Sequence, residues 1–208
     1  MPVHDEAVEF LQLFSEADSQ NRSRALEDLK FANGDQWPSY AIQSRGMERP
    51  QLTINETDAY CRQVENQQRQ QRPRINVHAT NLLADPKVAK VLKGICRHIE
   101  VNSNGDVAYD TAFSFAIRMG WGYFRLYRDY IREDSNDQDI FIGVIDNPFT
   151  VYFDPNSTAL DGSDAERVLI TDLMTKKAFR KAYPGAQESG FNQRATGDSE
   201  TTSMTAAP

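Results

Sequence analysis

A cysteine close to a histidine is the first feature of this 208-residue sequence that could carry chemistry. Cys96 and His98 supply the sulfur and nitrogen donors that zinc commonly binds in proteins. They lie in a stretch with helical periodicity, where residues at this spacing point to different sides of the helix. The other histidines, His4 and His78, are far away in the sequence. We therefore expect a buried thiol and a surface imidazole here, and no bound metal.

Two glycines around a tryptophan are a second candidate, because glycine pairs occur in loops that bind nucleotide phosphates. Gly120 and Gly122 flank Trp121, but the third glycine of a dinucleotide-binding loop is missing. The pair also follows a predicted helix and precedes a predicted strand, the reverse of the order that such a loop requires. No G-x-x-x-x-G-K-[ST] pattern occurs in the sequence. We expect the glycines to form a tight connection between the helix and the strand.

An acidic cluster could bind a cation. Its members are Asp129, Glu133, Asp134, Asp137 and Asp139. The cluster lacks the glycine and the terminal glutamate of a calcium-binding loop, which favours a solvated turn.

Two arginines beside aromatic side chains could bind single-stranded nucleic acid. Arg125 and Arg128 alternate with aromatic residues in a predicted strand, as in proteins that combine base stacking with phosphate contacts. The acidic turn beside them favours salt bridges across a hairpin instead. No nucleophile motif such as G-x-S-x-G accompanies the histidines. Taken together, these patterns predict neither an enzyme nor a cofactor.

The charge distribution leaves one binding function open. The net charge of -7 argues against a chain that coats nucleic acid electrostatically. Residues 51–100 nevertheless contain eight Lys and Arg against five Asp and Glu, whereas residues 101–150 contain four against eight. The basic stretch 62–97 is therefore either a solvated or interface surface, or the site of a nucleic-acid-binding module.

Several classes of protein are disfavoured by simpler features. Cys61 and Cys96 lie far apart in predicted helices, which favours free thiols in a reducing compartment over a disulfide framework. No apolar run approaches the roughly 20 residues of a membrane span. The acidic N-terminus has no basic segment of a signal peptide. We expect a protein made in the cytoplasm, without a membrane partner.

The secondary structure that would position the candidate residues is predicted to be mainly helical in the first part of the chain and mainly strands in the later part. Helices are predicted over residues 5–31 (as one or two helices), 56–71, from Asp85-Pro86 to a break at 102–105, 107–119 and 176–183. The helix at 56–71 is so polar that either a neighbouring subunit or a narrow covered stripe must explain it. Strands are predicted over 75–77, 123–131, 140–145, 150–153 and 168–171, with loop and short extended pieces over 39–54.

This order predicts an α+β fold in which helices precede a small antiparallel sheet. We expect residues 1–186 to form one region. The tail at 187–208, rich in small and polar residues, should be disordered or mark a truncation.

A series of landmark positions runs through residues 20–186. They are Trp37, Pro38, Arg49, Pro50, Asn55, Pro73, Gly120, Gly122, Arg125, Asn147, Pro148, Asp154 and Pro155. Each is weak alone, but together their order and spacing resemble the portal proteins of short-tailed (podovirus), Salmonella-phage-type bacteriophages.

The resemblance implies a structural role. Such proteins form a dodecameric ring at one vertex of the virion capsid, through which double-stranded DNA is packaged and ejected, and on which the terminase and tail proteins dock. It implies a wing-like region in a homo-oligomer, without catalytic residues, cofactors or a small-molecule substrate. Members of the family are several times longer, so we expect this chain to be an N-terminal fragment.

Overall fold

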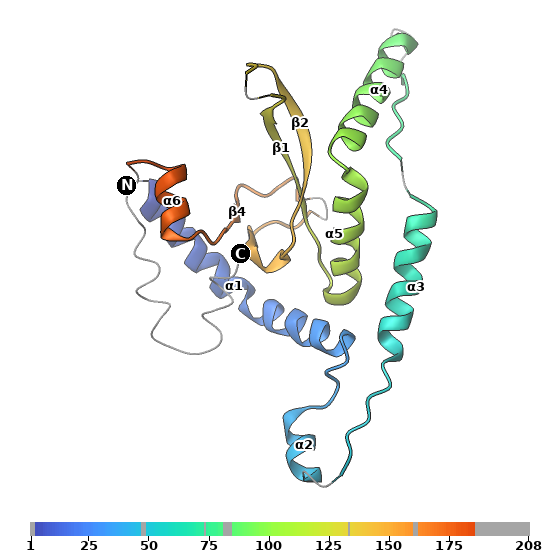
Figure 1. Ribbon diagram of the computed structural model, residues 1–208, viewed down its shortest axis with the longest axis vertical. Helices are drawn as coiled ribbons and strands as arrows, with labels where there is room; N and C mark the ends of the chain where they lie inside the picture. Colours follow the sequence, from blue (N-terminus) through green and yellow to red (C-terminus); the bar gives the residue numbers. More distant parts are fainter. Residues whose placement is uncertain are drawn as a thin grey trace. The chain divides into compact units, whose positions relative to one another are not determined.

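The computed structural model describes residues 3–46, 49–72, 74–80, 85–132, 134–159 and 162–185. The described residues form six α-helices, one short 3-10 helix and four strands, which confirms the predicted α+β fold (Figure 1). The chain divides into two compact units. One contains the described residues of Arg24–Asp146, and the other contains the described residues up to Ser23 together with those from Asn147 to residue 185. The predicted disordered tail at 187–208 lies outside the described residues, and no helix among those described is long and apolar enough to cross a membrane.

The helix predicted over 5–31 is a single helix, α1 (Val3–Ala32). The polar run in its middle does not interrupt it, because its side chains bond within the helix. The Ser19 hydroxyl donates to the carbonyl of Glu16 at 2.9 Å, and Arg22 forms an ion pair with Asp18 at 3.1 Å. Hydrogen bonds of this local kind let Ser and Asp remain inside a helix.

The other predicted helices are confirmed, with ends set by capping residues. They are α3 (Glu56–Gln70), α4 (Pro86–Asn102), α5 (Gly105–Met119) and α6 (Lys176–Ala182). The side chain of Asn55 accepts from the amide of Asp58 at the start of α3, and that of Asp85 accepts from the amide of Lys87 at the start of α4. Such caps satisfy amides that have no partner within the helix.

Two local predictions are wrong. The segment predicted as loop at 39–54 contains a short helix, α2 (Ser39–Arg45), which begins where the carbonyl of Pro38 accepts from two amides in the following turn. The strand predicted at 75–77 is absent, since residues 74–80 form no regular structure. A few extended apolar residues do not make a strand without a second strand to pair with.

The larger unit, Arg24–Asp146, has a hairpin packed on helices. Strands β1 (Phe124–Tyr130) and β2 (Gln138–Val144) pair antiparallel, with Phe124 opposite Val144. Helices α4 and α5 pack mainly on β2 (Figure 1). Ile142 of β2 is buried beside Gly105. By contrast, every residue of β1 is exposed. The buried apolar residues of this unit are Ala25, Ala32, Cys61, Ala108, Ala112, Met119, Ile142 and Ile145.

The register of this hairpin contradicts the cross-strand salt bridges expected for its arginines. Gly143 lies opposite Arg125 and Ile140 lies opposite Arg128, so neither arginine faces a carboxylate across the hairpin. The guanidinium of Arg125 instead lies 5.2 Å from the centre of the Tyr127 ring, a cation–π arrangement.

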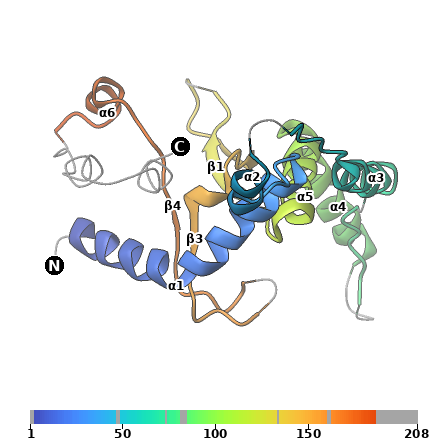
Figure 2. The same ribbon diagram turned by 90° about the horizontal axis from the view of Figure 1, so that it is seen from below.

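The second unit joins the N-terminal part of α1 to the last strands. A 3-10 turn, η1 (Pro148–Thr150), leads into β3 (Val151–Phe153), which pairs antiparallel with β4 (Val168–Ile170) (Figure 2). Arg22 of α1 donates to the carbonyls of Phe149 and Val151, and its guanidinium lies 4.0 Å from the ring centre of the buried Tyr152. The predicted strands thus form two separate two-stranded sheets.

Candidate functional site

Helix α3 is held on α5 by charge pairing. Glu65 is buried on the inner side of α3, where it accepts hydrogen bonds from Arg118 and, at 2.9 Å, from the Ser114 hydroxyl. Arg118 also reaches Asp58 on the preceding turn of α3, at 3.3 Å. A buried carboxylate is stable in such a place only when a charged partner and further hydrogen bonds surround it.

A second ionic cluster lies at the other end of the same helix pair. Arg69 and Arg72 approach the same carboxylate, Asp110 of α5, at 3.3 and 3.0 Å, and Arg72 also pairs with Asp106. These contacts explain how so polar a helix is packed. Its inner stripe is covered by α5 of the same chain through ion pairs, which answers part of the question that the sequence left open.

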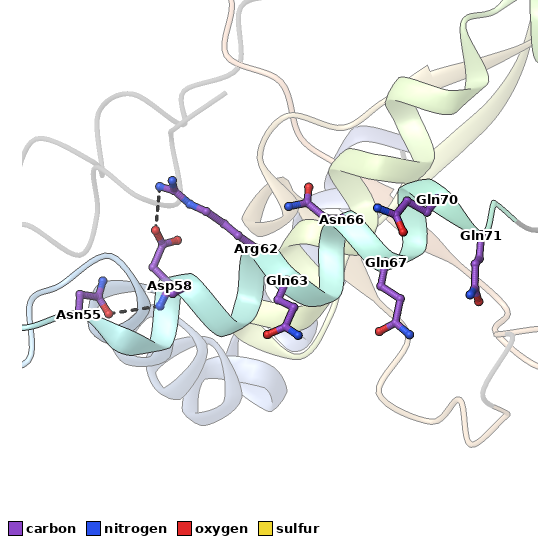
Figure 3. Close-up of a pocket in the computed structure, with 9 residues that line it drawn as sticks. Asn55, Asp58, Arg62, Gln63, Asn66, Gln67, Gln70 and Gln71 are labelled. Atoms are coloured by element: carbon purple, nitrogen blue, oxygen red, sulfur yellow. Dashed lines mark hydrogen bonds and ion pairs between the residues drawn. The ribbon is translucent and has the colours of Figure 1, made fainter.

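Among the described residues nothing covers the outer side of α3, which lines an open recess (Figure 3). Four exposed amide side chains follow one another along it, and we call this surface the amide face: Gln63, Asn66, Gln67 and Gln70. At its N-terminal end, Arg62 forms an ion pair with Asp58 at 2.7 Å.

The chemistry of the amide face is that of a binding surface. Carboxamides both donate and accept hydrogen bonds, but they neither transfer protons near neutral pH nor act as nucleophiles. The residues lining the recess are mostly carboxamides, and Asp58 and Arg62 are paired at one end of it. A row of amides can exchange hydrogen bonds with another polar protein surface.

The His, Cys, Asp and Glu side chains of the described residues do not form a group that could hold a metal ion. Cys61 and Cys96 are free thiols, and no group of three potential ligands comes together among the described residues. Cys96 is half-buried, and His98 is mostly exposed, 3.5 Å from a carboxylate oxygen of Asp139.

The first landmark residues organise the region where α1 leads into α3. The Asn55 side chain donates to the carbonyl of Ala32 at 2.7 Å while it caps α3. Trp37 and Pro38 lie in the non-helical segment before α2, as predicted, with the guanidinium of Arg45 4.8 Å from the Trp37 ring centre.

The middle landmarks are more dispersed. Gly120 and Gly122 form the connection from α5 to β1, as predicted, and Arg125 lies on the exposed strand β1. Arg49 and Pro50 are exposed in the segment between α2 and α3, whereas Pro73 lies outside the described residues.

The last landmarks build the turns of the smaller unit. The Asn147 side chain accepts from the amide of Phe149, and Pro148 is fully buried. Asp154 is buried and accepts from the amide of Glu166 at 3.2 Å, whereas Pro155 after it is exposed. The described contacts give Asn55, Asn147 and Asp154 capping or turn-forming roles.

The loop after Asp154 is closed by a second aspartate, Asp164. Its carboxylate accepts from the Ser157 hydroxyl at 2.6 Å, from the amide and hydroxyl of Thr158, and from the amide of Ala159. These hydrogen bonds, that from Ser157 most of all, hold the pKa of Asp164 well below its usual value of 3.8.

The lowered pKa of Asp164 should affect the stability of the protein in acid. The carboxylate form of Asp164 stabilises the folded loop above the ordinary aspartate pKa, and this contribution is lost as the pH falls below about 4. The Asp164→Asn variant should therefore show a free energy of unfolding that decreases less steeply from pH 5 to pH 2. Urea titrations at a series of pH values measure it. Asp172→Asn, which removes an exposed carboxylate outside this loop, should keep the wild-type slope, and an unchanged slope in Asp164→Asn would count against the role of the loop.

Sequence reasoning missed the residues that hold the helices together. Arg118, Glu65 and Asp110 were not singled out, because their partners lie between 38 and 60 residues away along the chain. The only available signal was weak: acidic and basic residues on α3 that recur at helical spacing, on a helix with too few apolar residues to pack by hydrophobic contact.

Comparison with known proteins connects the chain to a single kind of protein. A family model described as "Phage P22-like portal protein" matches residues 9–206. The curated "Portal protein" of Acyrthosiphon pisum secondary endosymbiont phage 1 is 23% identical over 173 residues, which are 78% of this chain and 24% of that protein. The chain thus spans about a quarter of the length of this relative.

Proposed function

The chain belongs to the family of phage P22-like portal proteins, and from this membership we propose that it is part of a structural subunit of the portal ring at a capsid vertex. In this role the ring is the channel through which double-stranded DNA is packaged and ejected. The terminase docks on it during packaging, and tail proteins dock on it later. The observation that carries the proposal is the family match, which extends over nearly the whole chain.

The oligomeric state, the place of synthesis and the position of the chain within the subunit are inferred from the resemblance of its landmark residues to portal proteins. We infer a dodecameric homo-oligomer that is made in the host bacterial cytoplasm and incorporated into the virion. From the same resemblance we infer that the chain corresponds to the N-terminal, wing-like part of the subunit, and it spans only 24% of its curated relative. The landmark residues, from Trp37 to Pro155, would form the turns and caps that this part of the subunit needs.

The surfaces of the described residues support a role in assembly. Portal proteins are structural components rather than enzymes, and the amide face offers hydrogen bonds without a catalytic group. Large apolar side chains are exposed along α4 and β1. A ring subunit has to present such surfaces, because neighbouring molecules cover them on assembly.

The alternative of a nucleic-acid-binding module in the 62–97 stretch is weakened by the ion pairs. Arg62, Arg69, Arg72 and Arg97 each bind a carboxylate of the same chain. A guanidinium that is already neutralised in this way gains less from a phosphate, because it must first give up its partner.

Labelling of virions tests the proposed function. Affinity-purified antibodies raised against the chain, detected with gold particles on phage released from cells that carry the gene, should mark a single vertex of each particle. Antibodies against the major shell protein provide the control, because they should label the whole surface. Gold spread over the shell, or confined to free protein outside particles, would exclude the portal role.

A further inference from the structure

The two ends of α3 are attached to α5 by different sets of residues. Asp58, near the start of α3, pairs with Arg118 near the end of α5. Arg72, just beyond the end of α3, pairs with Asp106 at the start of α5. The two helices therefore run antiparallel, and in Figure 1 they lie next to each other in opposite directions. Each end of α3 thus has its own partners on α5.

The N-terminal end of α3 is anchored by buried contacts. The two buried residues of α3, Cys61 and Glu65, belong to this part of the helix. Glu65 bonds to Arg118, and because both side chains are largely buried, salt screens this pair little. The Asn55 side chain also donates to the carbonyl of Ala32 at 2.7 Å, which ties the start of α3 to the end of α1. This end should therefore resist separation from the rest of the unit.

The C-terminal end of α3 is held by partly exposed ion pairs. Arg69 and Arg72 approach Asp110 at 3.3 and 3.0 Å, and the two arginine side chains are 48% and 37% exposed. No residue of α3 after Glu65 is buried, so apolar contact adds little at this end. Ion pairs exposed to this degree are weak, and salt screens them. The attachment of this end should therefore depend on the ionic strength.

Two buried oxygen atoms near these ion pairs form no hydrogen bond with the described residues. They are Oε1 of Gln68 on α3 and Oδ1 of Asp110 on α5. They therefore add no direct bond between the two helices, and separation of the helices would bring both atoms into water without breaking a hydrogen bond to either. The chain after this end also allows movement, since residues 74–80 form no regular structure and all but Val77 are exposed.

We propose that α3 is a hinged arm, anchored at its N-terminal end and able to separate from α5 at its C-terminal end. The hinge lies at Asn55 and the buried pair of Glu65 and Arg118, and the ion pairs of Arg69 and Arg72 are the latch. Opening of the latch changes the angle at which the amide face meets another molecule, while α5 and the hairpin keep their places. The proposal goes beyond the portal role and does not depend on it.

Distances between pairs of spin labels test the hinge. The labels are attached to cysteines introduced at exposed positions, in a chain that carries Cys61→Ala and Cys96→Ala. Leu126→Cys on β1 is the fixed point, Gln70→Cys marks the movable end of α3, and Tyr60→Cys marks the anchored end. Pulsed electron paramagnetic resonance measures the distance from position 126 to position 70 in one sample and to position 60 in the other.

A rise in NaCl from about 0.01 M to about 1 M shortens the Debye length from about 30 Å to about 3 Å. Over this range the distances from position 126 to position 70 should gain a longer component. The ratio of open to closed molecules should rise at least about tenfold, because salt screens all the ion pairs of the latch together. The distances from position 126 to position 60 should stay the same. Distances that change at both positions, or at neither, would overturn the proposal.

Removal of the latch charges should open the arm without salt. Arg69→Gln with Arg72→Gln should show the longer distance component already at low salt, and added salt should change it little. Arg62→Gln is the matched control, because Arg62 pairs with Asp58 of the same helix and not with α5. It should keep the salt response of the parent chain. A double variant that stays closed at low salt would contradict the latch. If circular dichroism shows that this variant does not fold, the salt titration alone decides.

Hydrogen exchange measures the same motion in the chain without any substitution. A helix end that has left its partner frays, so peptides covering residues 66–72 should exchange at least about tenfold faster in high salt. Peptides covering residues 56–62 should exchange at the same rate in both conditions. Protection of residues 66–72 that does not change with salt would overturn the proposal. Vertex labelling remains independent: labelled vertices with a closed arm would remove the hinge and leave the portal role.

Discussion

Replacement of Gly122 by alanine should lower the free energy of unfolding by at least about 3 kcal/mol, at the upper end of the range for overpacking. A Cβ at this position would lie 2.6 Å from the carbonyl carbon of Ala112 and closer still to its oxygen. That carbonyl belongs to the backbone of α5, so it cannot rotate away as a side chain would. Either the start of β1 or the last turns of α5 must move.

Gly120→Ala is the matched control, because the two glycines flank the same tryptophan. Gly120 has a positive φ of 94°, and nothing lies within 4 Å of its Cβ position. Alanine there should cost only the strain of a left-handed backbone, about 1–2 kcal/mol. Urea denaturation of both variants measures the difference. If both variants lose the same free energy of unfolding, or if Gly120→Ala loses more, then contact between a Cβ at position 122 and the Ala112 carbonyl does not destabilise the protein.

Replacement of Arg118 by methionine should cost about 3–5 kcal/mol, because it leaves the buried carboxylate of Glu65 without its cation. The Arg118 side chain is only 15% exposed and that of Glu65 only 10%, so water cannot replace the lost partner. The Ser114 hydroxyl would remain as a single neutral donor. The contact between α3 and α5 should loosen first.

Arg62→Met tests whether burial is the cause. Arg62 pairs with a carboxylate of the same helix at 2.7 Å, but its side chain is 69% exposed, and such pairs contribute about 0.3–0.5 kcal/mol. The double variant Arg118→Met, Glu65→Leu should recover most of the loss, since it removes the unpaired charge. Chemical denaturation is again the measurement. A loss in Arg118→Met no greater than that in Arg62→Met would show that this network does not hold the helices.

The local structure was largely predictable because its causes are local. The sequence predicted helices that begin near residues 56 and 86, and in the structure the side chains of Asn55 and Asp85 accept hydrogen bonds from amides within the next three residues. Aromatic residues interleaved with arginines located β1, a run of Ile, Phe and Val located β2, and the two glycines located the connection from α5 to β1. The prediction failed for α2, which begins directly after Pro38. A proline favours extended structure in the residue before it, but it gives no local indication of whether a helix follows.

The candidate site was less predictable because it depends on distant residues. The sequence indicated that α3 is too polar to pack by hydrophobic contact, but it did not indicate which residues would neutralise its charges. The partners Arg118 and Asp110 lie on α5, far along the chain. Nor did the periodicity of α4 indicate that Val88, Val91, Leu92 and Ile95 would be exposed, since the same pattern is found in helices buried in a core.

The sequence by itself determined the helix ends, the α+β order and, through its ordered landmarks, the resemblance to portal proteins that the family match confirms. Those features depend on hydrogen bonds and steric contacts between near neighbours. Only the tertiary structure decided that the strands form two separate sheets, that α5 covers the inner side of α3, and that no described residue covers Val88, Val91, Leu92 and Ile95 of α4. The physical reason is that pairing and burial are set by which distant surfaces meet, and a periodic pattern describes one surface at a time.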